Sequence, residues 1–309
     1  MLRRLLLSVA SSPRIKRGIE VVPVTRSVVN RFVAGEDIDS AITAARQLVA
    51  DGMLATIDRL GESVAEIEQA RATADAYVAL LKAIFDSGQS VSTEVSLKLS
   101  SLGQGLGADG ERIALENAQL VCAAARNAGT TVTVDMEDHT TTDATLSAVR
   151  ELRRDFPTVG AVVQAYLRRT EADCRDLGGE GSRVRLCKGA YREPASVAHQ
   201  DRAAVDLSYV RCLRVLMHGK GYPMVATHDP RLVAITGAMA LQSGRSKGEY
   251  EYQMLLGIRP DEQRRLATRG EKIRVYVPYG AEWYPYLMRR LAERPANVSF
   301  FLRALASRR

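Results

Sequence analysis

The sequence contains few cysteines, and no two of them have the spacing of a metal-binding or redox motif. Cys122, Cys174, Cys187 and Cys212 are scattered without a C-x-x-C pair, which argues against structural zinc and a disulfide framework and favours a reducing compartment. No apolar run is long enough to span a bilayer, and the leucines at 5–7 are too few for a secretory signal. We therefore expect a cytoplasmic globular protein, whose 309 residues suffice for one barrel-sized domain or two smaller ones.

Positive charge is concentrated at the N-terminus. Residues 1–31 hold seven Lys or Arg and one acid, a net +6 out of +7 for the whole chain. A nucleic-acid groove needs basic residues along a whole face, so this distribution argues against nucleic acid as a partner. Three interpretations of residues 1–31 stay open: a solvated extension, which we favour, a transit peptide, and a peripheral contact with the inner face of the cell membrane.

The first third of the sequence is expected to be helical. Asp37 or Asp39 can cap a helix that Gly52 closes, and an Ala-rich helical run extends from about residue 63 to 85. We recognise no strand signal in residues 36–89. We therefore expect residues 1–90 to form a helical arm that packs on a catalytic domain of residues 91–309.

From residue 91 onward, short β-branched or apolar runs alternate with helix-length amphipathic segments, which predicts a parallel sheet with crossover helices. Seven strands are clear and an eighth is expected at residues 298–301. This number favours an eight-stranded (βα)8 barrel over a doubly wound sheet, which stays the alternative. The seven clear strands are expected at residues 95–99, 131–135, 161–167, 183–188, 223–228, 250–255 and 273–277.

Nearly every expected strand ends in polar or charged residues. In a parallel barrel the carboxyl ends of the strands form the mouth, where active sites lie. With Arg289 and Arg290, the mouth is expected to be strongly cationic and to suit an anionic cofactor together with a carboxylate substrate. The polar residues at the strand ends are Lys98, Asp135, Gln164, Arg185, Lys188, Thr227, His228, Gln253 and Tyr276.

Three carboxylates and a histidine follow one strand, at Asp135 and at 137–139, and this grouping is compatible with a divalent metal. We expect no metal, because Lys98 and Arg185 at neighbouring strand ends oppose a cation. The run from Arg185 through Lys188 to Gly189 and Ala190 is instead typical of a strand that enters a small-residue turn. Such a turn lets backbone N–H groups approach a phosphate that Lys188 can also meet.

The C-terminal helix carries Tyr286 one turn before Arg289 and Arg290, with Glu293 one turn after them. A guanidinium donates two parallel hydrogen bonds to a carboxylate, so this group is a plausible clamp for an amino or imino acid. Two enzymatic interpretations stay open at this point: a Schiff base on Lys98 or Lys188, and a phosphate-bearing redox cofactor. A non-enzymatic scaffold that binds through the basic arm is the third alternative.

Seven motifs, in order along the chain, resemble the proline dehydrogenase family, most closely its short, single-function bacterial members. The first is Ser96-Leu97-Lys98-Leu99-Ser100, and the resemblance extends from about residue 91 to 303. The others are Val134-Asp135-Met136-Glu137, Gln164-Ala165-Tyr166-Leu167, Arg185-Leu186-Cys187-Lys188-Gly189-Ala190-Tyr191, Ala226-Thr227-His228-Asp229, Tyr250-Glu251-Tyr252-Gln253-Met254-Leu255 and Tyr286-Leu287-Met288-Arg289-Arg290-Leu291-Ala292-Glu293.

The resemblance implies a distorted (βα)8 barrel that binds FAD non-covalently. It implies oxidation of L-proline to Δ1-pyrroline-5-carboxylate by hydride transfer to flavin N5, with electrons passed to a membrane quinone, ubiquinone or menaquinone. This would be the first step of proline catabolism to glutamate. No second catalytic domain is recognisable, so a separate pyrroline-5-carboxylate dehydrogenase is expected to take the product.

The resemblance also implies roles for individual residues. Asp135, Arg185 and Tyr276 would be catalytic, with Arg185 near flavin N5. Tyr276 and Tyr286 would wall the ring pocket, and tyrosine at 286 favours proline over hydroxyproline. Substrate binding would fall to Lys98, Tyr286, Arg289, Arg290 and Glu293, and FAD binding to Met136, Gln164, Arg185, Lys188, Gly189, Ala190, Thr227 and His228.

Overall fold

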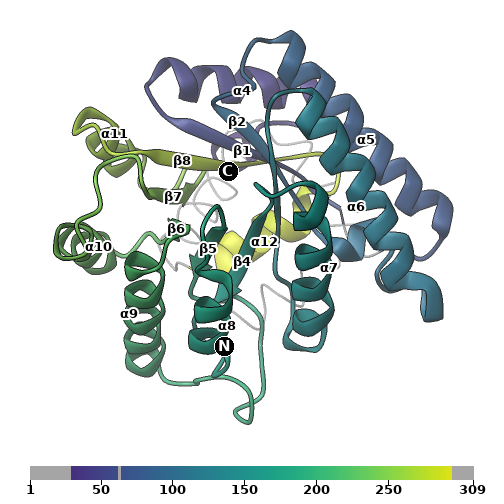
Figure 1. Cartoon of the computed structure of the whole chain (residues 1–309). Helices are drawn as coiled ribbons and strands as arrows, with labels where there is room; N and C mark the ends of the chain where they lie inside the picture. The colour runs from purple at the N-terminus through teal and green to yellow at the C-terminus, as the bar shows by residue number, and fades with distance from the viewer. Residues whose placement is uncertain (1–28, 62–63, 294–309) are drawn as a thin grey trace, which may run out of the picture.

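Eight parallel strands form a closed barrel in the order β1 to β8, with β8 pairing back to β1 (Figure 1). The structure is a computed structural model that describes residues 29–61 and 64–293, with side chains as far as Met288. The strands are β1 (Leu54–Arg59), β2 (Thr93–Leu97), β3 (Val132–Val134), β4 (Gly160–Gln164), β5 (Arg183–Cys187), β6 (Tyr222–Ala226), β7 (Glu251–Leu255) and β8 (Ile273–Tyr279).

The barrel confirms the expected fold class, and the seven clear strands of the sequence are β2 to β8. The prediction that residues 36–89 contain no strand is wrong, because β1 lies there and pairs with both β2 and β8. The barrel therefore begins before residue 91. The eighth strand expected at 298–301 lies outside the described residues, and the eight strands that close the barrel all lie between Leu54 and Tyr279.

A helix follows each strand, and the helices surround the barrel (Figure 1). At the start of the first helix, the Asp37 carboxylate accepts from the Ser40 N–H at 2.8 Å, which confirms the expected cap. None of the described helices combines the length and apolarity needed to cross a membrane. The helices are α4 (Ile38–Ala50), α5 (Ile67–Asp86), α6 (Gly110–Asn127), α7 (Thr142–Asp155), α8 (Thr170–Leu177), α9 (Arg202–His218), α10 (Pro230–Gln242), α11 (Pro260–Thr268) and α12 (Trp283–Glu293).

The last helix, α12, lies beside the mouth of the barrel. Its buried residues Tyr286 and Leu287 belong to an apolar cluster with Leu60 and Ile258, which lie just beyond the carboxyl ends of β1 and β7. The indole Nε1 of Trp283 donates to the Glu36 carboxylate at 3.0 Å. These contacts place α12 at the face where the strands terminate.

The interior of the barrel is lined by charged residues, whereas such barrels are usually filled with branched apolar side chains. Glu94 of β2 is 2% exposed and pairs across the barrel with Arg183 of β5 at 2.5 Å. Arg274 of β8 pairs with Glu251 of β7 at 2.7 Å. Burial raises the pKa of Glu94, but the charges of Arg183, Arg274 and Arg185 together lower it to about 2.

We predict that Glu94→Gln destabilises the protein by about 3–5 kcal/mol, because it leaves buried arginines without their counter-charge. The folded-state pKa of Glu94 is depressed, so its stabilising contribution is complete above about pH 4.5 and is lost as the pH falls towards about 2. Chemical unfolding at several pH values measures both effects. The exposed Glu116, which pairs with Arg112 on α6, supplies the control Glu116→Gln. An equal loss of stability in the two variants would contradict the prediction.

Candidate functional site

The carboxylate of Asp135, just beyond the end of β3, contacts four other groups at the mouth. Its Oδ1 accepts from Arg185 Nη1 at 2.6 Å and from Ser96 Oγ at 2.8 Å. Its Oδ2 accepts from the Tyr276 hydroxyl at 2.7 Å and lies 3.7 Å from Lys98 Nζ. Strands β2, β3, β5 and β8 thus contribute side chains to one point, so the structure brings together the three residues expected to be catalytic.

Lys98 is held mainly by Asp58, a residue of β1 that the sequence interpretation missed. Lys98 Nζ donates to both Asp58 oxygens, at 2.8 and 2.9 Å, and Asp58 is 1% exposed. Burial lowers the pKa of Lys98, but the negative charges of Asp58 and Asp135 raise it by a larger amount. The net pKa of Lys98 therefore lies above the ordinary value. Lys98 is therefore protonated near neutral pH, which makes it a poor nucleophile and argues against a Schiff base at this position.

Arg185 is almost completely buried and contacts both Asp135 at the mouth and Glu94 in the barrel interior. Its Nε donates to Gln253 Oε1 at 2.6 Å, and its guanidinium carbon lies 5.3 Å from the centre of the Tyr276 ring. Its Nη2 makes no hydrogen bond to the described residues and has only Glu94 at 3.8 Å. A buried donor in this state is available to an acceptor on a ligand.

Tyr276 remains a neutral phenol over the working pH range of most enzymes. Burial, followed by the charges of Asp135 and Asp58, raises its pKa well above the ordinary value. Tyr276 therefore keeps the hydroxyl proton that it donates to Asp135.

The turn after β5 brings backbone close to a neighbouring ring. Gly189 has φ +105°, and a Cβ added there would lie 2.3 Å from atoms of the Tyr166 ring. Only glycine fits this position, because other residues rarely adopt this φ and their Cβ would overlap the Tyr166 ring. Lys188, before it, pairs with Asp206 of α9 at 2.5 Å and with Asp229, the N-cap of α10, at 3.3 Å. Ala190, after it, is exposed.

The other residues expected to bind the cofactor have structural contacts at the same face. Gln164 Nε2 donates to the Glu137 carbonyl at 2.7 Å, and His228 Nε2 accepts from the Leu255 N–H at 2.9 Å. Thr227 Oγ1 accepts from the Asp229 N–H at 3.1 Å. Met136 is buried in the core.

The three carboxylates that follow β3 make different contacts. Only Asp135 joins the cluster of the mouth, whereas Glu137 accepts from the Ser100 hydroxyl at 2.7 Å and Asp138 caps a short helical turn at Thr140 N. Within the described residues, no group of three or more His, Cys, Asp or Glu side chains is arranged to hold a metal ion.

The expectation of a strongly cationic mouth is wrong for the described side chains. Lys98, Arg185 and Lys188 each have a carboxylate partner, so their charges are compensated within the protein. The backbone of α12 carries Arg289, Arg290 and Glu293, but their side chains lie outside the described part of the chain. The expected clamp therefore stays a prediction, whereas Tyr286 is described and is 7% exposed.

Three residues of the cluster, Ser96, Gln253 and Asp58, were not assigned a role from the sequence. Gln253, a polar strand end, holds Arg185, and Asp58 holds Lys98. The signal for Asp58 was present, because residues 54–59 are a short run with two β-branched residues and an acid next to its end. It was missed because this run stands alone between two helical segments.

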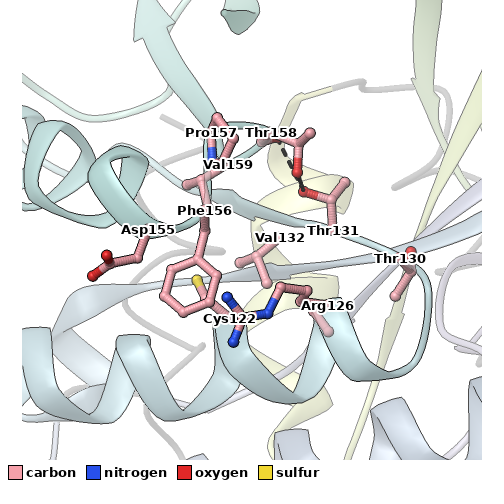
Figure 2. A pocket seen from close by; sticks show the side chains of 11 residues that line it. Cys122, Arg126, Thr130, Thr131, Val132, Asp155, Phe156, Pro157, Thr158 and Val159 are labelled. Carbon is pink, nitrogen blue, oxygen red and sulfur yellow. Dashed lines mark hydrogen bonds between the residues drawn. The ribbon is translucent and has the colours of Figure 1, made fainter. Parts of the chain in front are cut away.

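A separate surface pocket of about 240 Å³ lies between the segments that enter β3 and β4 (Figure 2). Phe156 and Arg126 contribute to it, with the guanidinium 5.0 Å from the ring centre. Residues that precede parallel strands lie at the barrel face opposite the mouth. This pocket is therefore distinct from the Asp135 cluster.

We predict that Asp58→Asn lowers the pKa of Lys98, because it removes the nearest negative charge while Asp135 remains. Labelling with acetic anhydride, followed by mass spectrometry, should show Lys98 reacting several-fold faster at pH 9 in the variant. Asp86→Asn is the matched control, since its partner Lys82 is exposed and should react at nearly the same rate with and without the change. Unchanged labelling of Lys98 would refute the assigned electrostatics.

Comparisons with known proteins agree with this geometry. The family model for proline dehydrogenase matches residues 41–303. Proline dehydrogenase 1 of Bacillus subtilis is 39% identical over 281 residues, which cover 91% of each protein. Proline dehydrogenase of Deinococcus radiodurans is also 39% identical, over 305 residues that cover 98% of this chain and 97% of that protein.

A solved structure of proline utilization A from Bdellovibrio bacteriovorus, inactivated by N-propargylglycine, has the same fold with a TM-score of 0.80. It is 23% identical, and the match covers 87% of this chain and 33% of that one. The family model matches most of the chain, and the two relatives are similar to it over nearly their full lengths. The chain belongs to the proline dehydrogenase family.

Proposed function

We propose that this oxidoreductase converts L-proline to Δ1-pyrroline-5-carboxylate with FAD as its cofactor and a membrane quinone as the final electron acceptor. The observation that carries the proposal is the cluster around Asp135, where Arg185, Tyr276 and Lys98 meet at the mouth of the barrel. The relatives named above as proline dehydrogenases support proline as the substrate.

The residues at the mouth fit a flavin dinucleotide. The left-handed Gly189, with φ +105°, suits a turn that directs backbone N–H groups at an anion, and a pyrophosphate would share Lys188 with Asp206 and Asp229. The buried Arg185 Nη2 lacks a hydrogen-bond acceptor among the described residues and is suited to a ring nitrogen or carbonyl. The proposed FAD-binding residues are Met136, Gln164, Arg185, Lys188, Gly189, Ala190, Thr227 and His228.

When bound, the flavin supplies an acceptor for the hydride that leaves the substrate carbon next to nitrogen. The protein must then hold that carbon in place and exclude water. Lys98 provides a charge for the substrate carboxylate, and we assign Arg289 and Arg290, oriented by Glu293, to the same carboxylate. Asp135 orients Arg185 and Tyr276 and thereby fixes the position of both groups relative to the substrate.

The pocket for the substrate ring would be formed by two tyrosines. Tyr276 stands at the mouth with its hydroxyl bound to Asp135, and Tyr286 is buried on α12 beside Leu60 and Ile258. Large aromatic walls favour a small apolar ring over a hydroxylated one. We therefore propose proline as the preferred substrate over hydroxyproline.

The wider setting follows from the proposed reaction. The enzyme would act in the cytoplasm and reach its membrane quinone, ubiquinone or menaquinone, from there. A peripheral membrane contact through residues 1–31 is the alternative to the solvated extension that the sequence favours. The product would pass to a separate pyrroline-5-carboxylate dehydrogenase. In this setting the enzyme catalyses the first step of proline catabolism to glutamate.

The proposal predicts that the purified protein shows a flavin absorption spectrum, or acquires it when FAD is added. L-Proline added without oxygen should then bleach the band near 450 nm within seconds to minutes. A protein that stays colourless with FAD would rule out the cofactor. A flavin that proline leaves oxidised would rule out the substrate and retain the fold.

The proposal also predicts that Tyr286→Ser changes substrate preference. Removing the ring should lower kcat/KM for L-proline by about tenfold or more, because apolar contact with the substrate ring is lost. The ratio of hydroxyproline to proline turnover should rise. Tyr284→Ser is the control, since Tyr284 lies in the same buried cluster of α12 and has no assigned substrate contact. The same change of preference in both variants would contradict the role of Tyr286.

A further inference from the structure

A buried carboxylate outside the Asp135 cluster connects three loops of the mouth. Glu193, in the segment after β5, is 8% exposed. Its Oε1 accepts from the His139 backbone N–H at 2.9 Å and from the Tyr166 hydroxyl at 3.3 Å, and its Oε2 contacts His139 Nδ1. The loops that follow β3, β4 and β5 therefore meet on one side chain.

The Gly189 turn packs against Tyr166. The backbone N–H of Tyr166 donates to the Lys188 carbonyl at 2.9 Å, and the carbonyl of Tyr166 accepts from the His199 N–H at 2.8 Å. Its ring occupies the space that a Cβ of Gly189 would need. The position of this ring thus determines how far the backbone at residue 189 can move.

The Tyr166 hydroxyl donates to Glu193, and this hydrogen bond completes a ring of contacts between the two segments. Residues 188–193 leave β5, turn over the Tyr166 ring at Gly189, and return to the same tyrosine through Glu193. The bonds from His139 fix the carboxylate from the opposite side. A carboxylate buried in this way is costly unless it is fully hydrogen-bonded, so its three partners act together.

We infer that Glu193 is a positioning residue for the cofactor: acting through Tyr166 and His139, it fixes the Lys188–Ala190 turn in the conformation that receives the dinucleotide phosphates. The inference rests on the proposed function for the identity of the ligand, and on the contacts above for the positioning itself. Glu193 has no direct contact with the reacting atoms in this assignment.

The test compares Glu193→Ala with Glu193→Gln and Tyr166→Phe in the full-length protein. A glutamine keeps Oε1 as an acceptor for His139 N–H and Tyr166, so FAD affinity should remain within about threefold of the original. Alanine removes all three contacts and should weaken FAD binding by about tenfold or more, measured by flavin fluorescence. Hydrogen exchange of the peptide covering 188–191 should become faster in Glu193→Ala, both with and without FAD.

Double substitution distinguishes a shared network from two separate effects. If Glu193 acts through Tyr166, the loss of affinity in Glu193→Ala combined with Tyr166→Phe should be clearly smaller than the product of the two single losses. Independent, multiplicative losses would overturn the inference. Tyr166→Phe keeps the aromatic ring and removes only the hydroxyl. If Glu193→Ala does not fold, Tyr166→Phe is the variant that tests the inference.

Tyr250 provides a matched control, because its hydroxyl donates to Glu271 at 3.0 Å near the start of β7, away from the mouth. Tyr250→Phe should leave FAD affinity and exchange at 188–191 unchanged. Equal effects of Tyr250→Phe and Tyr166→Phe, or unchanged affinity and exchange in Glu193→Ala, would overturn the inference. If the original protein binds no FAD, the proposed function fails, while exchange measured without flavin still decides whether Glu193 fixes the turn.

Discussion

The ion pair between Arg185 and Asp135 connects the charged interior of the barrel to its mouth. A guanidinium that is 5% exposed is costly unless its charge is compensated, and here Asp135 pairs with it while Ser96 and Gln253 accept from its Nη1 and Nε. Because Asp135 is held by Arg185, its second oxygen is fixed for Tyr276. The charged interior of the barrel therefore contributes directly to the geometry of the mouth.

Charged residues in the interior also connect strands that are not neighbours in the sheet. Glu94 on β2 pairs with Arg183 on β5, and Asp135 after β3 pairs with Arg185 on β5 and accepts from Tyr276 on β8, so these contacts cross the barrel instead of following the sheet. Shifting one strand by a single residue would turn such a side chain towards the helices and leave its partner buried without a charge. The charged pairs in the interior thus favour one register of the strands, although burying ions is costly. The groups at the mouth come together only in that register.

Sequence reasoning identified the strands with β-branched or apolar runs and, through their polar ends, much of the site. It missed β1, whose six residues lie between two helices and include Ala55, and therefore missed Asp58 as the partner of Lys98. The pairing itself was inaccessible, because residues 40 positions apart meet only once the barrel closes. The same reason explains why the mouth was expected to be cationic: side-chain types show which charges are present, whereas their compensation depends on which strands are neighbours.

Compensated charge has a consequence for ligand selection. Lys98 is protonated and already contacts Asp58 and Asp135, so an incoming carboxylate must share this lysine with two acids. A simple anion would gain the contact with Lys98 and suffer repulsion from both carboxylates. An amino or imino acid carries a positive nitrogen next to its carboxylate, so the acids repel one end of the ligand and attract the other. The described charges at the mouth therefore favour a zwitterion over a plain anion, which an arrangement of unpaired cations would not do.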